Sequence, residues 1–491
     1  MSIYISRTDC PDVENIPSGV LAYIIRKHQH QCKRLDSLHE FYMNRNHPPI
    51  TDTEHGKSIA VPYSRLIVEL LKGYYLGEPI KYDGDDDTHD IGSQAVLATV
   101  KNGNVVRYNK LKDTIDDTIE PILEAYKNQT ISEVDNKLGE HIGIYGEAYE
   151  LVYVSDDSTP KSTVIDPRCC VMVRDDTVEH RKMFFLTYEY LERISGARYV
   201  RATVYTDRTK TVYEAPDLFK GDFIPTGEKM PLFFGEVPVI EYENNNNRIG
   251  DFEQEMSLID AYNNVLSDRV TDKARFIDSV LAVFGADIDD EMKKDLKEWR
   301  LLSGLPIESR IEYIQKVFDE NSVHILADDI STEIHKQSMT VDFSDVSFGN
   351  ASGQALKLKL LTMTMLIKNK IRSFEKGLKK RFEIYNKFYN IVSNMPLINK
   401  NNITPIFSIS IPIDENNIVD MVCKLQDIVD DETLLNLLWF VKDPRKVIEK
   451  MKVQRKERQS QYADAFGIRT KFEENTADDD DDDDSEDDYN E

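Results

Sequence analysis

One long stretch of helical pattern, residues 354–395, constrains the fold most. It ends before Pro396 and contains a single glycine, Gly377. Large apolar residues recur in it with an average spacing of about 3.67 residues, the period of a straight α-helix rather than a left-handed coiled coil. They are Leu356, Leu360, Met363, Ile367, Ile371, Phe374, Leu378, Phe382, Tyr385 and Tyr389. About 38 helical residues span about 57 Å, so the helix is expected to cross a body larger than a small domain.

This stretch is also positively charged, although the whole chain has a formal net charge of −27. Only Glu375 and Glu383 oppose its cations. The cations are Lys357, Lys359, Lys368, Lys370, Arg372, Lys376, Lys379, Lys380, Arg381 and Lys387. Two interpretations stay open. The cations form a solvated face or pair with acids of a neighbouring subunit, or they face the phosphates of a nucleic acid.

A segment of small residues directly precedes this helix. Residues 347–353 read SFGNASG, with one aromatic side chain, Phe348. Glycine and small polar residues give a backbone that adopts many conformations, as in a binding loop. We therefore expect a flexible tip immediately before the most basic helix of the chain.

The acidic balance is concentrated at the C-terminal end but is not confined to it. Eleven of the fourteen residues from Asp478 onward are acidic, and the formal charge without those eleven acids is still −16. Such a block buries nothing and repels itself, so we expect residues 471–491 to be disordered. It is either a solubilising tail, or a lure for a basic partner and a repellent for nucleic acid.

Length and composition set the class of protein. The 491 residues suggest two to four domains, and their apolar content suits a folded chain. No apolar run is long enough for a transmembrane helix, and the first residues do not resemble a secretion signal. Five irregularly spaced cysteines indicate reduced thiols rather than a disulfide framework.

The pattern along the chain predicts a mixed α+β fold. Helices are expected over residues 16–44, over the first part of 60–82 and within 111–139, and again from about residue 253. Residues 146–242 alternate β-branched and aromatic residues between polar turns, which predicts one meander of antiparallel strands. The insert that follows is expected to hold a charged helix at 289–302, strands at 311–318 and 323–327, and then a short helix near 329–340.

No chemical site stands out. HGKS at residues 55–58 resembles the end of a phosphate-binding loop, but Thr51 occupies the position of the required first glycine. The ten histidines are scattered, and neither a zinc motif nor a nucleophile with its base is evident. We expect no catalytic residue, no metal and no cofactor.

The order of features resembles the portal (head–tail connector) proteins of tailed bacteriophages, in the branch common in phages of Gram-positive hosts. The resemblance extends from about residue 15 to 395. GYYLGEPIKY at 73–82 comes first, and YGEAYELVYV at 145–154 and IDPRCCVMV at 165–173 open the β-rich part. VPVIEYENNNNRIGDFEQEMSLIDAYNN at 237–264 and FGNASGQALK at 348–357 follow. Each motif alone is weak, and their order and spacing carry the resemblance.

The resemblance implies a ring of about twelve copies at one capsid vertex, built from a wing, a stem, a clip and a crown. It implies a wing over residues 1–252, a first stem helix at 253–280, a clip at 281–327, and a second stem helix at 328–340. A tunnel loop at 341–353, a long helix returning into the wing at 354–395, and a helical crown at 396–470 follow. The implied channel residues are Ser347, Phe348, Gly349, Asn350, Ala351, Ser352, Gly353, Lys357 and Lys359.

The implied function is to package and eject double-stranded DNA through the ring, without reading its sequence and without enzymatic activity. The implied partners are the packaging terminase, head-completion or adaptor proteins, a scaffold protein and the major capsid protein. The protein would reside in the virion, and in the host cytoplasm during assembly, with no membrane partner. The alternatives are another structural, scaffold or adaptor component of a particle, and a packaging ATPase or nuclease, which would need a phosphate loop or a metal cluster.

Overall fold

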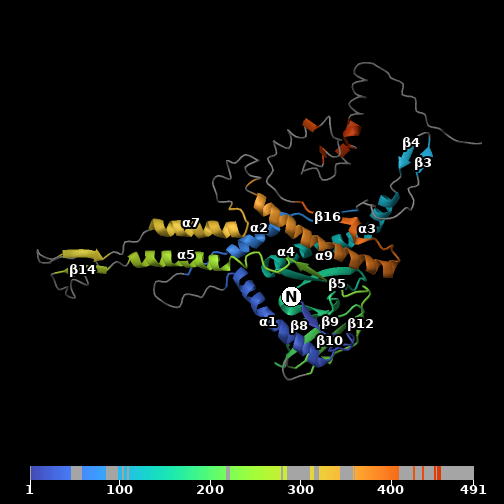
Figure 1. The fold of residues 1–491 in the computed structure, drawn as a ribbon, viewed down its shortest axis with the longest axis horizontal. Helices are drawn as coiled ribbons and strands as arrows, with labels where there is room; N and C mark the ends of the chain where they lie inside the picture. The colour runs from blue at the N-terminus through green and yellow to red at the C-terminus, as the bar shows by residue number, and fades with distance from the viewer. Residues whose placement is uncertain are drawn as a thin grey trace, which may run out of the picture. The chain divides into compact units, whose positions relative to one another are not determined.

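The computed structural model divides the chain into two units, Met1–Ile411 and Pro412–Glu491 (Figure 1). It describes residues 2–45, 58–84, 98–101, 104–107, 110–216, 222–277, 280–284, 310–314, 320–342, 360–408 and a few isolated positions, among them Leu358. The predicted helix at 289–302 and residues 343–357 lie outside the described residues.

Seven long helices are described in the first unit. They are α1 (Ser18–Tyr42), α2 (Tyr63–Leu76), α3 (Lys110–Asn128), α4 (Ile131–Tyr145), α5 (Met256–Ile277), α7 (Glu320–Gln337) and α9 (Leu361–Ser393). The helical predictions for residues 16–44, 60–82 and 111–139 are confirmed as α1, α2, and α3 with α4. In α1 the predicted apolar side, from Leu21 to Phe41, is buried.

The strands form one large sheet and several small ones. The seven-stranded sheet has the order β1-β7-β8-β9-β10-β11, with β12 paired to β10, and a separate three-stranded sheet has the order β13-β5-β6. The bounds in the large sheet are β1 (Ile3–Ile5), β7 (Cys170–Asp175), β8 (Lys182–Glu192), β9 (Arg198–Tyr205), β10 (Thr209–Ala215), β11 (Ile224–Pro225) and β12 (Met230–Pro231). Those in the second are β5 (Glu147–Val154), β6 (Pro160–Ile165) and β13 (Val239–Glu243).

The prediction of a single meander over 146–242 is therefore wrong in its connectivity, although the strands themselves are present. The turn at Asp166 divides it. The Asp166 carboxylate accepts a hydrogen bond from the Arg168 amide at 2.9 Å, and residues Pro167–Cys169 form a 3₁₀ turn. The chain consequently leaves the small sheet at Ile165 and enters the large one at Cys170. A strand that the sequence did not predict, β1, pairs in parallel with β7 at the edge of the large sheet.

Three groups of buried apolar side chains hold these layers together. The largest lies among α1, α2, α3, α4, α9 and the small sheet. A second lies between the large sheet and the first half of α1, where Phe184 and Leu186 of β8 point. The third lies between the two sheets and includes Phe185, on the opposite face of β8. Alternation along β8 therefore covers both faces of the large sheet.

The prediction of a strand at 323–327 is wrong, and the helix predicted at 328–340 begins earlier. Both segments belong to α7, Glu320–Gln337. Ala327 and Ile334 are buried, and Val323 and Ile330 are half-buried between exposed neighbours. Steps of four, three and four residues are a helical period, which the short apolar run VHILA concealed. The strand prediction at 311–318 is confirmed in part by β15 (Arg310–Ile314).

The first residues after α9 return to the same body. The strand β16 (Ile403–Ile406) pairs with β2 (Lys81–Gly84), and Phe407 lies 6.2 Å from Phe374 of α9 between ring centroids. The remaining described pairs are β3 (Ala98–Lys101) with β4 (Asn104–Arg107), and β14 (Val280–Phe284) with β15. The first residues of the predicted crown (396–470) thus belong to the first unit, which continues to Ile411.

Candidate functional site: the paired helices and helix α9

Helices α5 and α7 run side by side, away from the sheets (Figure 1). Glu320 at the start of α7 accepts a hydrogen bond from Arg269 of α5 at 3.4 Å and also pairs with Lys273. Among the described side chains, only Ile259 and Asn263 of α5 and Ala327 and Ile334 of α7 are buried. The pair is thus held by little apolar burial within one chain.

Tyr63, the first residue of α2, lies between the two helices. Its ring packs edge-on against Tyr262 of α5 at 5.2 Å and against His335 of α7 at 5.7 Å. Its hydroxyl shares a hydrogen bond of 2.8 Å with Ser331 of α7. The nearby amide of Val61 donates to the Asn263 side chain at 2.8 Å. One end of the pair is therefore fixed to the helical body.

The other end of the pair leads into the antiparallel hairpin β14–β15. Val280 pairs with Ile314 and Phe284 with Arg310. The strand β14 follows α5 within three residues of Ile277, and the chain from β15 reaches α7 at Glu320. The helix pair and the two hairpin strands thus project from the body together.

Helix α9 is buried much more deeply in the body than α5 and α7 are. Twelve of its 33 residues are buried, and its apolar stripe from Leu360 onward faces the core, against which Ile371 and Tyr389 pack as half-buried side chains. The described part of the predicted stripe is therefore confirmed. Gly377 marks the closest approach, since a β-carbon there would overlap the ring of Tyr242 in β13. The helix crosses the small sheet at this glycine because no larger residue would fit.

A fully buried cluster of charges lies one turn further along α9. Arg381 donates from Nε to Glu150 of β5 at 2.6 Å, and its Nη2 lies 2.7 Å from Asp135 of α4. The Tyr242 hydroxyl donates to the other oxygen of Glu150 at 2.6 Å. Burial acts against the charge of Arg381, but the two carboxylates raise its pKa well above the usual range. The guanidinium therefore stays charged and joins α9 to α4 and to the small sheet.

A second buried ion pair lies three helical turns earlier. The Lys370 ammonium contacts both oxygens of Asp251, at 2.5 and 2.7 Å, and donates to Asn244 at 2.8 Å. The Asp251 amide in turn donates to the Gly143 carbonyl at the end of α4 at 2.7 Å. Asn244 is the first residue of the polar NNNN run at 244–247, and Asp251 follows that run by four residues. If α9 slid or rotated by one residue, the buried carboxylates would lose their cations. The register of α9 is therefore fixed.

Three of the six remaining cations of α9 also find partners within the chain. Lys379 pairs with Glu375 at 2.7 Å. Lys380 and Lys387 both contact Glu236 and Glu383, at distances between 2.5 and 3.1 Å. These three cations thus have acidic partners within the chain itself, which neither interpretation of the sequence included. Lys368, Arg372 and Lys376 are exposed, and no ion-pair partner is found for them in the described ranges.

The sequence contained a signal for the two buried cations. Lys370 stands three residues after Ile367 and four before Phe374, and Arg381 stands three after Leu378. Both therefore occupy the apolar side of the helix, where a cation is expected only with a buried partner. The predicted channel residues Ser347 to Gly353, with Lys357 and Lys359, lie outside the described residues, so their placement stays a prediction.

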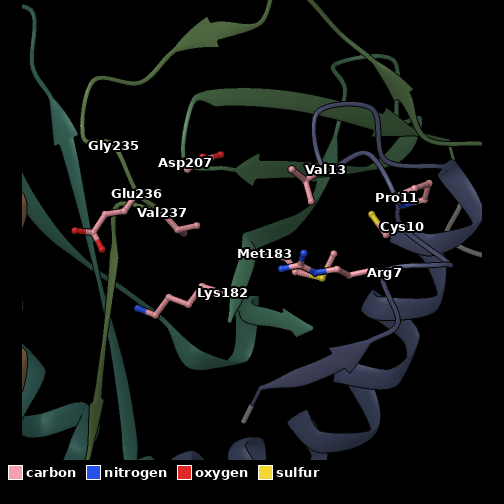
Figure 2. A pocket seen from close by; sticks show the side chains of 10 residues that line it. All are labelled: Arg7, Cys10, Pro11, Val13, Lys182, Met183, Asp207, Gly235, Glu236 and Val237. Atoms are coloured by element: carbon pink, nitrogen blue, oxygen red, sulfur yellow. The ribbon is translucent and has the colours of Figure 1, made fainter. Parts of the chain in front are cut away.

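A hollow of about 440 Å³ lies between the segment that precedes α1 and the start of β8 (Figure 2). Its lining is Arg7, Cys10, Pro11, Val13, Lys182, Met183, Asp207, Gly235, Glu236 and Val237. Burial raises the pKa of the Cys10 thiol, and the Lys182 ammonium donates to the Val239 carbonyl at 2.9 Å. No histidine is in the lining. The hollow therefore offers no activated nucleophile with a base.

The described ranges lack two further kinds of feature. No group of three or more histidine, cysteine or carboxylate side chains in them is arranged to hold a metal ion. None of their helices is both long and apolar enough to cross a membrane. The four cysteines that the structure describes, Cys10, Cys32, Cys169 and Cys170, are free thiols.

Comparison with known proteins identifies the architecture. The model of the family described as "Phage portal protein, SPP1 Gp6-like" matches residues 21–461. The portal protein of Bacillus phage SPP1 is 22% identical over 434 residues, which cover 85% of this chain and 79% of that protein. The matched residues extend from α1 through α9. They therefore include the α5–α7 pair, helix α9 and the body against which α9 packs. The chain therefore belongs to the family of SPP1 Gp6-like phage portal proteins, which are non-enzymatic virion components that provide the DNA channel at a capsid vertex.

Proposed function

We propose that this portal protein assembles as a ring of about twelve copies, with α5 and α7 as the stem around a channel for double-stranded DNA. The observation that supports this most is the state of α7 in a single chain. Ile325 is 61% exposed and Leu326 is 49% exposed, whereas only Ala327 and Ile334 of this helix are buried. A ring of copies would cover apolar surface that one chain leaves in water.

The rest of the layout follows from this placement. The hairpin β14–β15 and the residues between its strands form the clip. The sheets with α1 to α4 and α9 form the wing, and residues 341–353 form the tunnel loop. Because the first unit continues to Ile411, the crown begins after it and precedes the acidic tail at 471–491. The clip contacts the packaging terminase and later the head-completion or adaptor proteins, while scaffold and major capsid proteins surround the ring.

A channel must enclose DNA without holding it. Each phosphate that a lysine neutralises adds affinity that depends on salt, and the many copies of a ring multiply this effect. An acidic body discourages such binding, and its formal charge of −16 without the eleven acids of the tail suits this role. Lys357 and Lys359, with the small residues 347–353, then centre the duplex through backbone phosphates without reading its sequence.

The assembly itself is tested by light scattering and negative-stain imaging of the same purified sample. Rings of about twelve copies with a central hole wide enough for a duplex are the expected result. Because rings of this kind can need nucleation, the sample is also examined with the scaffold protein present. Monomers that fail to close under both conditions would overturn the proposal in favour of an adaptor.

The tunnel-loop assignment is tested separately with the double variant Lys357→Ala and Lys359→Ala. Its matched control is Lys33→Ala with Lys137→Ala, which removes two exposed cations from α1 and α4. We expect only the first variant to reduce packaging or retention of DNA in particles, with rings of normal size. Equal packaging by both variants would show that the two lysines are structural.

A further inference from the structure

The outer face of α9 presents an unusual row of cations. Lys368, Arg372 and Lys376 follow one another at four-residue steps, and all three are exposed. Like charges at this spacing repel and destabilise an isolated helix. None of the three has an ion-pair partner in the described ranges, unlike Lys379, Lys380 and Lys387 on the same helix. Such a row is stabilised when an anionic surface lies against it.

Apolar side chains precede this row on the same helix face. Leu358 is 72% exposed, Leu361 is 45% exposed and Met365 is 57% exposed. Leu361 and Met365 are one turn apart and in line with Arg372, because the helix repeats every 3.6 residues. The surface along α9 thus changes from apolar to basic in the direction of the chain. A partner is expected to present apolar residues followed by acids.

The outer face of α7 has this complementary order. Ile325 and Leu326 are exposed, and Asp328 and Asp329 follow within one turn, also exposed. Asp328 contacts only His324 in its own helix, at 3.1 Å, among the ion pairs found in the described ranges. The helix carries four carboxylates and one lysine, whereas α9 carries eight cations and two carboxylates. The two helices are thus opposite in charge as well as alike in apolar pattern.

Both faces are exposed within one copy, and no ion pair joins them in the described ranges. Ile334 of α7 belongs to the same buried core as Met363 and Ile367 of α9. The inner faces of both helices therefore share that core, and their outer faces are turned outward. A meeting of the two outer faces requires a second molecule.

We propose that the outer face of α7 in one copy docks on the outer face of α9 in the next copy of the ring. The proposal rests on the ring that is proposed above. In this contact Ile325 and Leu326 pack against Leu361 and Met365, and the two helices run in the same direction. The acids Asp328 and Asp329 then face Lys368 and Arg372. Because the two faces differ, the contact is heterologous, which is the kind of interface that closes a ring.

Charge reversal on each face tests the pairing. One variant carries Asp328→Lys with Asp329→Lys, a second carries Lys368→Asp with Arg372→Asp, and a third combines all four changes. Each face variant is expected to raise the protein concentration at half-assembly at least about tenfold, because like charges then meet at every interface. The combined variant is expected to return within about threefold of the original protein, since every altered face again meets its complement.

The control variant is Lys33→Asp with Lys137→Asp, which reverses two exposed cations away from both faces and is expected to assemble normally. Circular dichroism confirms that each variant keeps its helices. If the unaltered protein forms rings and both face variants assemble equally well, this interface is wrong while the ring stands. If the combined variant is not rescued, the two faces do not meet.

A further outcome distinguishes nucleic acid as the occupant of the basic row. If Lys368→Asp with Arg372→Asp assembles normally but binds a short DNA duplex less tightly, the row faces phosphates and the interface proposal is overturned. If the unaltered protein forms no ring under any condition, the ring and the interface fall together.

Discussion

Helix α9 and the α5–α7 pair are both built from long amphipathic helices, yet they are stabilised in opposite ways. Helix α9 lies in a packed body and buries Lys370 and Arg381 with their carboxylate partners. The α5–α7 pair is joined by ion pairs to Glu320 that are largely exposed, and it leaves large apolar side chains in water. One chain thus completes the packing around α9 by itself, whereas it leaves apolar side chains of the helix pair exposed.

The largest effect on stability is expected for the buried charges of α9. Arg381→Met would leave Glu150 and Asp135 buried without their cation, which costs about 3–5 kcal/mol of unfolding free energy. Urea denaturation of the variant measures this cost. Lys379→Met, which removes a partly exposed pair with Glu375, is the control and should cost less than about 1 kcal/mol.

A second version of this experiment separates charge from packing. In the triple variant Arg381→Met, Glu150→Gln and Asp135→Asn, the buried carboxylates lose their charge together with the cation. We expect part of the lost stability to return, because the main cost is an unpaired buried charge. If the triple variant is no more stable than Arg381→Met, the cluster acts through packing alone.

A smaller effect is expected where α9 crosses the small sheet. Gly377→Ala places a methyl group against the Tyr242 ring and should cost about 1–3 kcal/mol. Gly73→Ala in α2 is a matched helical control, because nothing lies within 4 Å of its added carbon. Thermal unfolding of both variants measures the difference. Equal melting temperatures would mean that the crossing is looser than the structure indicates.

The next effect is pH-dependent and concerns Glu383. Burial opposes its charge, but hydrogen bonds from Lys387 and Lys400 and the charge of Lys380 lower its pKa from 4.5 to about 2. A pKa that is lowered by folding contributes stability that is complete above about pH 5 and is lost as the pH falls towards 2. After allowance for solvent screening, about 1 kcal/mol is expected from this group.

The comparison with Glu383→Gln isolates this contribution from the titration of other acids. The stability difference between the original protein and the variant should shrink as the pH is lowered from 6 to 3, as followed by urea denaturation at each pH. A difference that stays constant over this range would show that the three lysines do not stabilise the ionised form of Glu383.

The smallest effect on stability is expected for the exposed ion pairs between α5 and α7. Glu320→Gln removes the ion pairs with Arg269 and Lys273 and should lower the stability less than any of the variants above, with less effect at high salt. Denaturation in low and high salt measures this. A cost as large as that of Arg381→Met would contradict the contrast between the two regions.

The seat of α9 could be predicted only in part from the sequence. The apolar stripe was evident because a helical period is a local property. The partners of Arg381 and Lys370 were not, because Glu150, Asp135 and Asp251 lie more than a hundred residues away. The spacing of both cations relative to the stripe nevertheless indicated that they are buried. The tertiary partner of a buried charge is information that the local pattern does not contain.

The errors in the β-rich part and in α7 have a similar origin. Each strand was recognised by its alternation, but alternation does not specify the neighbour with which a strand pairs. The turn at Asp166 therefore looked like an interruption within one strand rather than a change of sheet. In α7 the run VHILA was too short to distinguish a strand from a helix, and only its continuation to Ile334 reveals the longer period.

The parallel pairing of β1 with β7 has a consequence for the order of events during synthesis. Ile3, Tyr4 and Ile5 pair with residues 173–175, and the Ser2 hydroxyl donates to Glu241 at 3.2 Å. During synthesis β1 therefore emerges well before its partner strand β7 and pairs only after β7 has been made. Contacts so distant along the chain form slowly. The edge of the large sheet thus closes only after residues 173–175 have been made, and the contact of Ser2 forms only after Glu241 has followed.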